Sequence, residues 1–577
     1  MSKESSDFVV VLCGGAGQGI KTLEGLLTHV LKRQGYNVFA TKEVMSRIRG
    51  GCNSTELRVS SKPVGCHVDR INLLIALNAA AVSHLRSRIS ADTLVVGAAE
   101  VLEQAREDGT LSDRQCAIVS FTDLGNDAGS KLYANSAAAG LVLGILDVEE
   151  NLLRDVLKEK FAAKGTDVRQ GNVDAAQAGA AEGRDLVQKG KVKATVRSDS
   201  ARSSDLLLTG AEAVGLGAIA GGCNVVGSYP MSPSTSVLVF LAQHADKFGI
   251  AVEQAEDEIA AINMGLGAWF AGGRALATTS GGGFALMCEG MSLAGMLESP
   301  MVIHLAQRPG PATGLPTRTE QGDLELAVYA GHGEFPRILL APGSPEQAFD
   351  LTRRAFDLAD QLQVPVIILT DQFLVDSYCN VTNLDLPNRP PEPCIAKTDA
   401  EYRRYTLTEN GLSPRGVPGH GSGVVCLDSD EHDEEGHITE DLQMRTQMVD
   451  KRLKRFDLIA NSAIPPEYTG REDAPNLVVA WGSTLRVVQE ALETIDRDDI
   501  ALLHFQQVYP LPPGTAELLK RAEKLVVLEN NATGQFAKLL KLHADADADA
   551  GIRKYNGMPF SAEEVEAALR NHFAQEA

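Results

Sequence analysis

Short apolar runs alternate with longer helical windows through the middle of the chain, and this alternation restricts the possible folds more than any other feature. The apolar runs lie at Asn224–Tyr229, Ala275–Thr279, Met301–Arg308, Arg337–Ala341 and Val364–Thr370. Apolar residues at helical spacing fill the intervals, as in Glu346–Leu362. Strands that alternate with helices form a parallel sheet covered on both faces. We therefore predict an α/β domain in this region.

The N-terminal part of the chain contains a second strand–helix–strand pattern. An apolar run at Phe8–Leu12 leads directly into the glycine-rich Gly14–Gly19, and helical spacing of apolar residues continues to Leu31. A second apolar run follows at Val38–Thr41. This order predicts a βαβ unit, which we expect to open an α/β domain of its own.

The length of 577 residues predicts about three or four domains. A polar stretch rich in Lys, Arg and Ser has the composition of a linker, and a Pro-rich, acidic stretch later interrupts the strand–helix rhythm. A third strand–helix series begins at Leu477–Trp481. We therefore predict five segments, namely an α/β domain at 1–187, a linker at 188–204, a second α/β domain at 205–380, an irregular connecting segment at 381–472 and a third α/β domain at 473–577.

Charge and composition exclude several classes of protein. The net charge of -22 and the pI of about 5.0 argue against nucleic acid or an anionic membrane as a partner. The chain has no long uncharged apolar run, and its start lacks an apolar leader, so we expect a cytoplasmic protein. The nine cysteines form no Cys-x-x-Cys pair, and the spacing of His432 and His437 matches no standard ligand pattern. We predict no disulfide framework, iron–sulfur cluster or metal ligand in this chain.

Four polar features fall at the carboxyl ends of the predicted central strands, where ligands gather in an open parallel sheet. They are the two-proline turn Tyr229–Thr235, the acidic Glu256–Glu258, the glycine turn Ser280–Gly283, and Arg308. Glycines without side chains would let a ligand approach the backbone. Each feature also suits an ordinary structural role: Glu258 at a helix N-terminus, Arg308 in an ion pair, and the prolines in a plain turn.

The chain resembles a known enzyme family in several motifs that occur in the same order. The turn YPMSPST resembles the YPITPS signature of the 2-oxoacid:ferredoxin oxidoreductases, which use thiamine diphosphate. Similar stretches of the subunit that fuses the family's γ and α parts are QAEDEIAA, HLAQRPGPATGLPTRTEQGDL, RYTLTENGLSPRGVPG, EHDEEGHITED and LENNATGQF. The resemblance implies a γ domain at 1–187, a pyrimidine-binding domain at 205–380 and a transketolase C-terminal-like domain at 473–577.

The resemblance also implies roles for residues of the central domain. Glu258 would bind a ring nitrogen of the cofactor's aminopyrimidine and so activate it. Arg308 would bind the substrate's 1-carboxylate, and Ser232, which replaces the signature's threonine, would contribute a hydroxyl. The backbone of Tyr229 and Pro230 would line the aminopyrimidine. Arg318 would suit the distal carboxylate of a dicarboxylic 2-oxoacid, although it also suits an ordinary loop or interface arginine.

The glycine turn of the N-terminal domain suits either a plain structural turn or a ligand site, and the ligand site has two interpretations. It begins like a dinucleotide-binding turn, but Gly19 comes too early for G-x-G-x-x-G, and no acidic residue stands in the expected place after the second strand. In the family that the chain resembles, this domain takes part in coenzyme A binding. The residues that would contribute are Gly15, Gly17, Gly19, Ser46, Arg47 and Arg49.

What the sequence lacks implies a partner. Enzymes with this cofactor hold its diphosphate and Mg²⁺ through a Gly-Asp-Gly motif, and this chain has no such motif and no cluster cysteines. The resemblance thus implies a β subunit that supplies the diphosphate–Mg²⁺ site and a [4Fe–4S] cluster, ferredoxin as electron acceptor, and an (αβ)2 heterotetramer.

The function implied is oxidative decarboxylation of 2-oxoglutarate to succinyl-CoA and CO₂, a reaction that is reversible in principle. Three alternatives stay open. The enzyme could prefer pyruvate or accept 2-oxoacids broadly, the chain could be a nicotinamide or flavin dehydrogenase, or it could be a non-catalytic scaffold.

Overall fold

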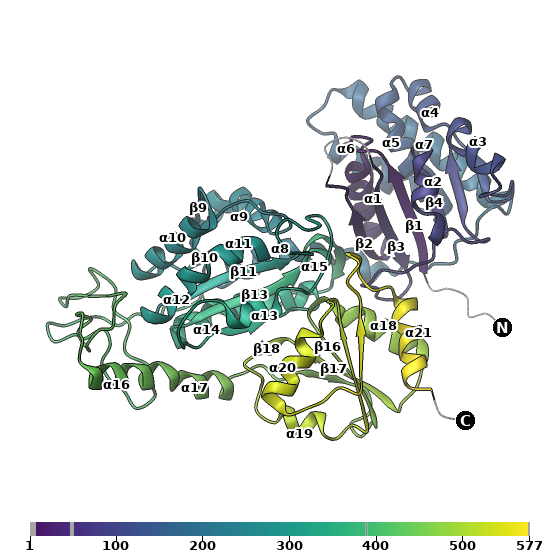
Figure 1. Cartoon of the computed structure of the whole chain (residues 1–577). Coiled ribbons are helices and arrows are strands. Elements are labelled where there is room, and N and C mark those ends of the chain that lie inside the picture. Colours follow the sequence, from purple (N-terminus) through teal and green to yellow (C-terminus); the bar gives the residue numbers. More distant parts are fainter. Residues whose placement is uncertain (1–6, 47–50, 387, 389, 575–577) are drawn as a thin grey trace. The chain divides into compact units, whose positions relative to one another are not determined.

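The computed structural model describes residues 7–46, 51–386, 388 and 390–574 (Figure 1). They form two compact units. Unit 1 holds the chain up to Leu208 together with Ser377–Asn383 and Ser561–Glu563, and unit 2 holds the remainder. Both units consist of sheets flanked by helices, so the predicted multidomain α/β class is confirmed. Within the described residues, no helix is long and apolar enough to cross a bilayer.

Unit 1 is built on an eight-stranded mixed sheet of order β6-β5-β4-β1-β3-β2-β14-β7. Its strands are β1 (Asp7–Gly14), β2 (Asn37–Glu43), β3 (Asn53–Ser60), β4 (Leu73–Ala76), β5 (Leu94–Gly97), β6 (Cys116–Ile118), β7 (Leu206–Thr209) and β14 (Tyr378–Val381). Strands β1, β4, β5 and β6 are parallel, whereas β3 runs antiparallel to both β1 and β2.

The strand β3 corrects the predicted βαβ unit. It lies between β1 and β2, so these two strands are not neighbours as they are in a simple βαβ unit. The strand could not be recognised from the sequence pattern, because its polar residues are buried in ion pairs rather than exposed. The guanidinium of Arg58 pairs with Asp7 at 2.7 Å, and Glu56 pairs with Arg88 at 2.5 Å. A folded protein tolerates buried charges of this kind when they are paired. Because charged residues occupy these buried positions, the segment lacks the run of apolar residues that indicates a buried strand.

The helices of unit 1 include a closely packed pair. Helix α7 (Thr166–Gln188) lies so near α5 (Ala134–Ile145) that a Cβ at Gly140 would overlap the carbonyl of Ala176, and one at Gly179 would overlap that of Ala137. The glycines therefore set the separation of the two helices. The others are α1 (Ile20–Gln34), α2 (Ala80–His84), α3 (Ala99–Glu107), α4 (Phe121–Asp127) and α6 (Glu150–Lys160).

Unit 2 contains a seven-stranded sheet of order β18-β12-β13-β11-β10-β8-β9, parallel except for β18. Its strands are β8 (Val225–Ser228), β9 (Ala251–Gln254), β10 (Ala275–Thr279), β11 (Met301–Gln307), β12 (Ile338–Leu340), β13 (Pro365–Asp371) and β18 (Gln507–Tyr509). The five apolar runs predicted as strands correspond to β8, β10, β11, β12 and β13, so these predictions are confirmed.

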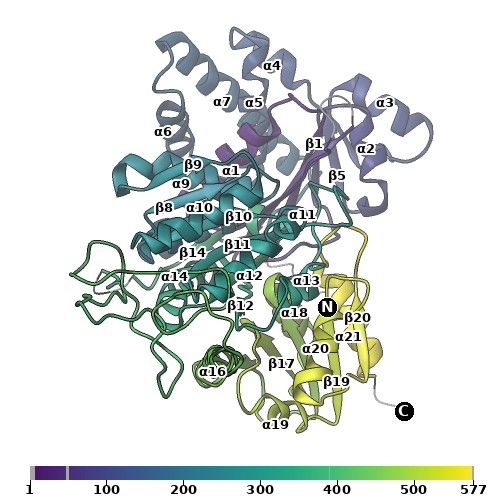
Figure 2. The same ribbon diagram turned by 60° about the vertical axis from the view of Figure 1, so that its left-hand side comes forward.

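The helices of this part of unit 2 form two groups, one on each face of the sheet. Helix α8 packs against α9 and α14. On the other face α10 packs against α11 and α12, and α11 against α13 (Figure 2). Right-handed crossovers require the same division. The bounds are α8 (Gly210–Ala220), α9 (Thr235–Phe248), α10 (Glu258–Phe270), α11 (Gly281–Leu286), α12 (Cys288–Met296), α13 (Leu324–Tyr329), α14 (Pro345–Leu362) and α15 (Gln372–Asp376).

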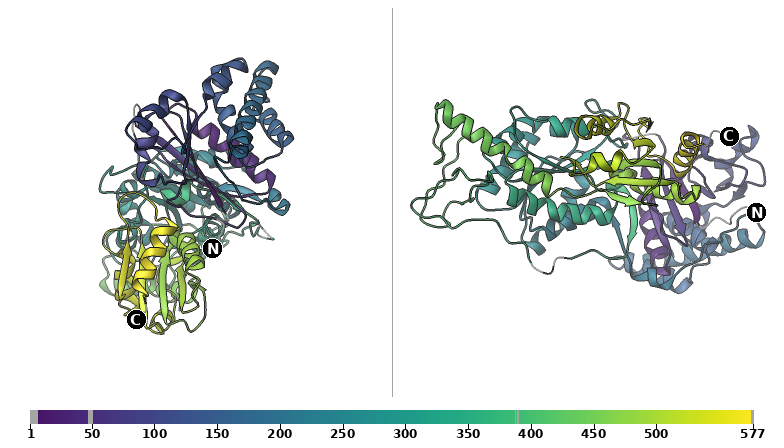
Figure 3. Two further views of the ribbon diagram at one scale, coloured as in Figure 1. Left: turned by 90° about the vertical axis from the view of Figure 1, so that its right-hand side faces the viewer. Right: turned by 90° about the horizontal axis from the view of Figure 1, so that it is seen from below.

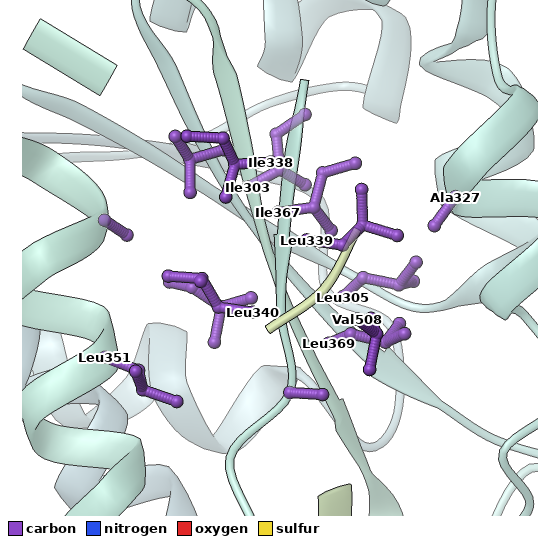
Figure 4. Packing of buried hydrophobic residues seen from close by; sticks show 14 of the residues in the cluster. Ile303, Leu305, Ala327, Ile338, Leu339, Leu340, Leu351, Ile367, Leu369 and Val508 are labelled. Carbon is purple, nitrogen blue, oxygen red and sulfur yellow. The ribbon is translucent and has the colours of Figure 1, made fainter. Parts of the chain in front are cut away.

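The core of unit 2 is centred on the middle strands of this sheet. Figure 4 shows Ile303 of β11, Leu339 of β12 and Ile367 of β13 packed together, and all three are fully buried. Strand β18 adds Val508 to the same cluster. The C-terminal part of the chain thus supplies an edge strand and core residues to the central sheet.

The rest of unit 2 comprises a second sheet and a loop-rich segment. The sheet has the order β15-β17-β16-β19-β20, and the long stretch before α16, green in Figure 3, runs mainly as loops. The strands are β15 (Glu467–Thr469), β16 (Asn476–Trp481), β17 (Ile500–Phe505), β19 (Lys524–Glu529) and β20 (Ala550–Arg553). The helices are α16 (Leu442–Leu453), α17 (Arg455–Asn461), α18 (Leu485–Ile495), α19 (Thr515–Leu519), α20 (Gln535–Ala544) and α21 (Ala562–His572).

Candidate active site

The loops that follow β8 and β10 leave the seven-stranded sheet toward opposite faces. The loop after β8 leads to α9 on one face, and the loop after β10 leads to α11 on the other. Neighbouring strands with this arrangement form a crevice at their carboxyl ends, which is the usual ligand site of an open α/β sheet. The two strands are tied together at these ends, because the Ser228 hydroxyl donates to the carbonyl of Thr278. The two-proline turn and the glycine turn therefore border the same crevice.

Glu258 is the first residue of α10 and is buried beside this crevice. The preceding Asp257 caps the helix by accepting a hydrogen bond from the N–H of Ala260 at 2.7 Å. Glu258 is only 2% exposed, and its Oε1 has no hydrogen-bond partner. Burial, and secondarily the negative charge of Asp257, raise the pKa of the Glu258 carboxyl above its ordinary value. A buried carboxyl oxygen without a hydrogen-bond partner destabilises the protein unless a ligand forms a hydrogen bond with it.

The glycine turn makes room for this carboxyl. A Cβ at Gly283 would overlap Oε1 of Glu258 and Oγ1 of Thr279. The absence of a side chain at Gly283 therefore leaves a polar recess. A flat heterocycle with a protonated ring nitrogen has the donor that Oε1 lacks, so the residues present fit the aminopyrimidine of thiamine diphosphate.

Arg308 and Ser232, both predicted to bind substrate, are in contact. Nη1 of Arg308 donates to the backbone carbonyl of Ser232 at 2.6 Å. The contact uses the carbonyl, and the Ser232 side chain is exposed. Burial lowers the pKa of Arg308, and the negative charge of Asp323 opposes this effect. The guanidinium is thus a cation at the end of β11, suited to a carboxylate.

The other predicted cofactor contacts also lie on the two-proline turn. Tyr229 is 39% exposed and Pro230 is partly buried.

Below the turn, a fully buried chain of hydrogen bonds crosses the sheet. The Thr370 hydroxyl lies 2.8 Å from Nε2 of His304, Nδ1 of His304 lies 2.7 Å from Oγ1 of Thr278, and that hydroxyl reaches the carbonyl of Ser234 at 3.5 Å. Burial lowers the pKa of His304 to about 3, so the ring is neutral.

A second carboxyl at the crevice was not singled out from the sequence. A Cβ at Gly281 would overlap both carboxyl oxygens of Asp323, and Oδ2 of Asp323 is shielded from solvent without a hydrogen-bond partner. Burial, and secondarily Glu320, raise the pKa of Asp323 to about 7, while Arg308 opposes the rise. The residue lies in the stretch HLAQRPGPATGLPTRTEQGDL that resembles the enzyme family, and this membership is the sequence signal that could have drawn attention to it.

Arg318 contacts another part of unit 2. Its Nη1 lies 3.7 Å from Sδ of Met558, and its side chain lies beside Gly557. These neighbours belong to the segment after β20. The contacts of Arg318 thus differ from those of Arg308, which reaches Ser232.

The described coenzyme A candidates, Gly15, Gly17, Gly19 and Ser46, lie in unit 1. The turn after β1 is braced by Gln18, whose Oε1 accepts from the N–H of Gly15 at 2.6 Å and whose Nε2 donates to Leu77 at 3.1 Å. Gly17 and Gly19 have φ values of 88° and 79°, which favour glycine. Ser46 is exposed, and the predicted Arg47 and Arg49 lie outside the described residues.

The described residues contain no group of three or more His, Cys, Asp or Glu side chains that could hold a metal ion. All nine cysteines lie among the described residues, and none of them forms a disulfide.

The chain is similar to proteins of one family along nearly its whole length. Residues 216–451 match the family described as pyruvate flavodoxin/ferredoxin oxidoreductase, thiamine diphosphate-binding, and residues 9–182 match pyruvate ferredoxin/flavodoxin oxidoreductase. The chain is 32% identical to 2-oxoacid:ferredoxin oxidoreductase subunit alpha of a Sulfolobus species, over 97% of this chain and 96% of that protein. It is 27% identical to 2-oxoglutarate oxidoreductase subunit KorA of Mycobacterium tuberculosis, over 97% and 91%.

A solved structure has the same fold. It is 2-oxoglutarate:ferredoxin oxidoreductase from Magnetococcus marinus with 2-oxoglutarate, coenzyme A and succinyl-CoA bound. The TM-score is 0.90 and the sequence identity is 28%, with 98% of this chain and 100% of that chain covered.

Proposed function

The chain belongs to the 2-oxoacid:ferredoxin oxidoreductase family, and on this premise we propose that it acts on 2-oxoglutarate. It is a subunit of an oxidoreductase complex and carries the family's thiamine diphosphate-binding domain. One observation supports a cofactor-activating role for this crevice: Oε1 of Glu258 faces Gly283 and has no hydrogen-bond partner. The names of the relatives from M. tuberculosis and M. marinus support 2-oxoglutarate as the substrate.

In this proposal Glu258 holds the proton of a ring nitrogen of the aminopyrimidine. The buried carboxyl accepts from that nitrogen when ionised and donates to it when protonated, and its raised pKa makes the two states closer in free energy. Gly283 keeps the recess open, and the backbone of Tyr229 and Pro230 lines the ring. Bound thiamine diphosphate supplies a nucleophilic carbon for the keto carbon of the substrate.

Arg308 binds the 1-carboxylate of the 2-oxoacid. Its bond to the Ser232 carbonyl orients the guanidinium and leaves other N–H donors for a planar anion. The Ser232 hydroxyl, exposed on the same turn, contributes a further hydrogen bond. Arg318 serves the distal carboxylate of 2-oxoglutarate.

The remaining parts of the enzyme are assigned by the same reasoning. Coenzyme A binds at the turn of unit 1 through Gly15, Gly17, Gly19, Ser46, Arg47 and Arg49. Its succinyl thioester is the product, together with CO₂. A β subunit supplies the diphosphate–Mg²⁺ site and a [4Fe–4S] cluster, ferredoxin accepts the electrons, and the assembly is a cytoplasmic (αβ)2 heterotetramer. Residues 1–187, 205–380 and 473–577 are its γ, pyrimidine-binding and transketolase-like domains, joined by the linker 188–204 and the connecting segment 381–472.

A dehydrogenase built on the N-terminal turn is disfavoured by the sheet of unit 1. Dinucleotide-binding βαβ units place their two strands side by side, and here β3 separates β1 from β2. Pyruvate remains the competing substrate, because both matched family descriptions name it.

The test is reconstitution with the partner subunit and assay of 2-oxoglutarate against pyruvate with a viologen acceptor. We expect kcat/KM to favour 2-oxoglutarate, and a preference for pyruvate would contradict the substrate assignment.

Glu258→Gln should lower kcat by about 10²- to 10⁴-fold, while Glu256→Gln, an exposed neighbour, should retain activity. Full activity in Glu258→Gln would remove this carboxyl from the mechanism.

A further inference from the structure

Asp323 lies in the crevice but has no role in the reaction described above. Its carboxyl rests against Gly281, its N–H donates to Oε1 of Gln307 at 3.0 Å, and its Oδ2 is shielded and without a partner. Ser280, in the same glycine turn, also has a buried hydroxyl oxygen without a partner. Two unsatisfied polar groups on one turn indicate that a polar ligand completes them.

The charges around Asp323 come from few groups. Arg308 at the end of β11 attracts a negative charge there, and Glu320 on the same loop repels it. On α13, Glu325 is paired with Lys538 of α20 at 3.0 Å, and the glycine turn itself is uncharged. Glu258 lies on the other side of the turn, beside Gly283. Arg308 is therefore the one cation acting on Asp323 among these groups.

Substrate binding adds a negative charge to this balance. If the 1-carboxylate of the substrate occupies Arg308, one guanidinium faces the substrate carboxylate and Asp323 together. Two carboxylates that share one cation in a partly desolvated site do not both stay ionised, because like charges raise each other's pKa. The substrate carboxylate is the stronger acid and is held by the guanidinium.

We propose that Asp323 takes up one proton when the 2-oxoacid binds, so that its carboxyl group becomes a neutral hydrogen-bond donor in the substrate site. The proton comes from solvent, and the O–H bond forms on the Asp323 carboxylate. The inference rests on the proposed function through the contact of the substrate carboxylate with Arg308. It makes Asp323 a determinant of substrate affinity that depends on pH.

The burial of the carboxyl supports this coupling. With the pKa of Asp323 at about 7 in the free protein, the group is already protonated at pH 6 and mostly ionised at pH 8. Uptake should thus be close to zero at pH 6 and approach one proton at pH 8. The dissociation constant should rise by up to tenfold per pH unit above pH 7.

The experiment is calorimetric titration of the complex with its partner subunit, without coenzyme A, using N-oxalylglycine, a non-decarboxylating analogue of 2-oxoglutarate. Heats in two buffers of different ionisation enthalpy give the number of protons taken up. Asp323→Asn should abolish the uptake and make affinity independent of pH, while Glu325→Gln, which removes a carboxyl two residues later in α13, should behave as wild type.

The outcomes separate this inference from the proposed function. Zero uptake by the wild type at pH 8, or unchanged uptake in Asp323→Asn, overturns the inference even if binding is normal. Undiminished binding of the analogue by Arg308→Gln instead contradicts the substrate site itself. If Asp323→Asn fails to fold, the wild-type dependence of affinity on pH decides the matter.

Discussion

The carboxyl of Glu258 occupies the space that a side chain on residue 283 would need. Because Gly283 has no Cβ, Oε1 of Glu258 and Oγ1 of Thr279 both approach its backbone. The preceding glycine of the turn differs, since a Cβ at Gly282 would have only the carbonyl of Ala312 nearby, at 3.8 Å. The two glycines therefore offer a matched pair of substitutions.

Gly283→Ala should displace the Glu258 carboxyl and lower kcat by about 10²-fold or more, because a small displacement of a catalytic group has a large kinetic cost. Gly282→Ala should keep most of the activity. Steady-state kinetics and a titration of thiamine diphosphate binding on both variants check this. An equal loss of kcat in the two variants would contradict the inference that Gly283 makes room for the Glu258 carboxyl.

Glu298 should be essential for the stability of unit 2. Its buried carboxylate pairs with Lys451 at 2.5 Å and with Arg455, and these charges lower its pKa to about 2. Glu298→Gln leaves two buried cations without a counter-ion, so we expect a loss of about 3–5 kcal/mol at pH 7. Denaturant unfolding measures this, with the exposed Glu289→Gln or Glu334→Gln as controls.

The pH dependence of this contribution follows from the direction of the shift. The folded pKa lies below the unfolded value, so the stabilisation is present above about pH 4.5 and disappears as the pH falls toward 2. The difference between wild type and Glu298→Gln should therefore shrink on acidification. A constant difference would show that the charge of Glu298 is not its source.

Asp323→Asn should stabilise the chain, and more so at high pH. The folded pKa of about 7 lies above the ordinary value of 3.8 for an aspartate carboxyl, so the wild type loses stability as the pH rises from about 4 to about 7. The upper limit of the gain at pH 8 is about 4 kcal/mol. Melting temperatures at pH 5 and pH 8 should diverge in favour of Asp323→Asn, whereas Glu325→Gln should track the wild type.

His304→Phe should weaken the support of the two-proline turn. It removes the bridge between Thr370 and Thr278, so the buried Thr370 hydroxyl loses its bond to the imidazole and the Thr278 hydroxyl keeps only the carbonyl of Ser234, at a cost of about 1–3 kcal/mol for an unpaired hydroxyl. Since His304 is neutral, the wild type should show no titration of this group between pH 5 and 9. Imidazole ¹⁵N shifts test the protonation state, and a charged ring at pH 6 would contradict it.

The residue pattern alone could predict the parts of the fold in which the buried residues are apolar. Strands such as Ala275–Thr279 were located because both faces of a parallel sheet are covered, which makes the strand uniformly apolar. β3 was missed because Arg58 and Glu56 are buried in ion pairs. Helix α7 was missed because Ala and Gly, rather than an apolar stripe, form its contact with α5.

The candidate site was only partly predictable for a related reason. Glu258 and Arg308 stand directly at element ends and within recognisable motifs, so their positions followed from local sequence. The recess at Gly283 and the environment of Asp323 depend on loops that converge from separate strands. Such distances between residues remote in sequence are set by the sheet order, which the pattern of strands and helices did not specify.

Strand β18 makes the C-terminal part of the chain inseparable from the catalytic sheet. It pairs with β12 although more than a hundred residues lie between them. A fragment cut after the loop-rich segment would leave β12 as a bare edge, with unpaired amides beside an apolar surface. Such edges recruit other strands, so a truncated catalytic half would self-associate at β12 instead of remaining a usable minimal enzyme.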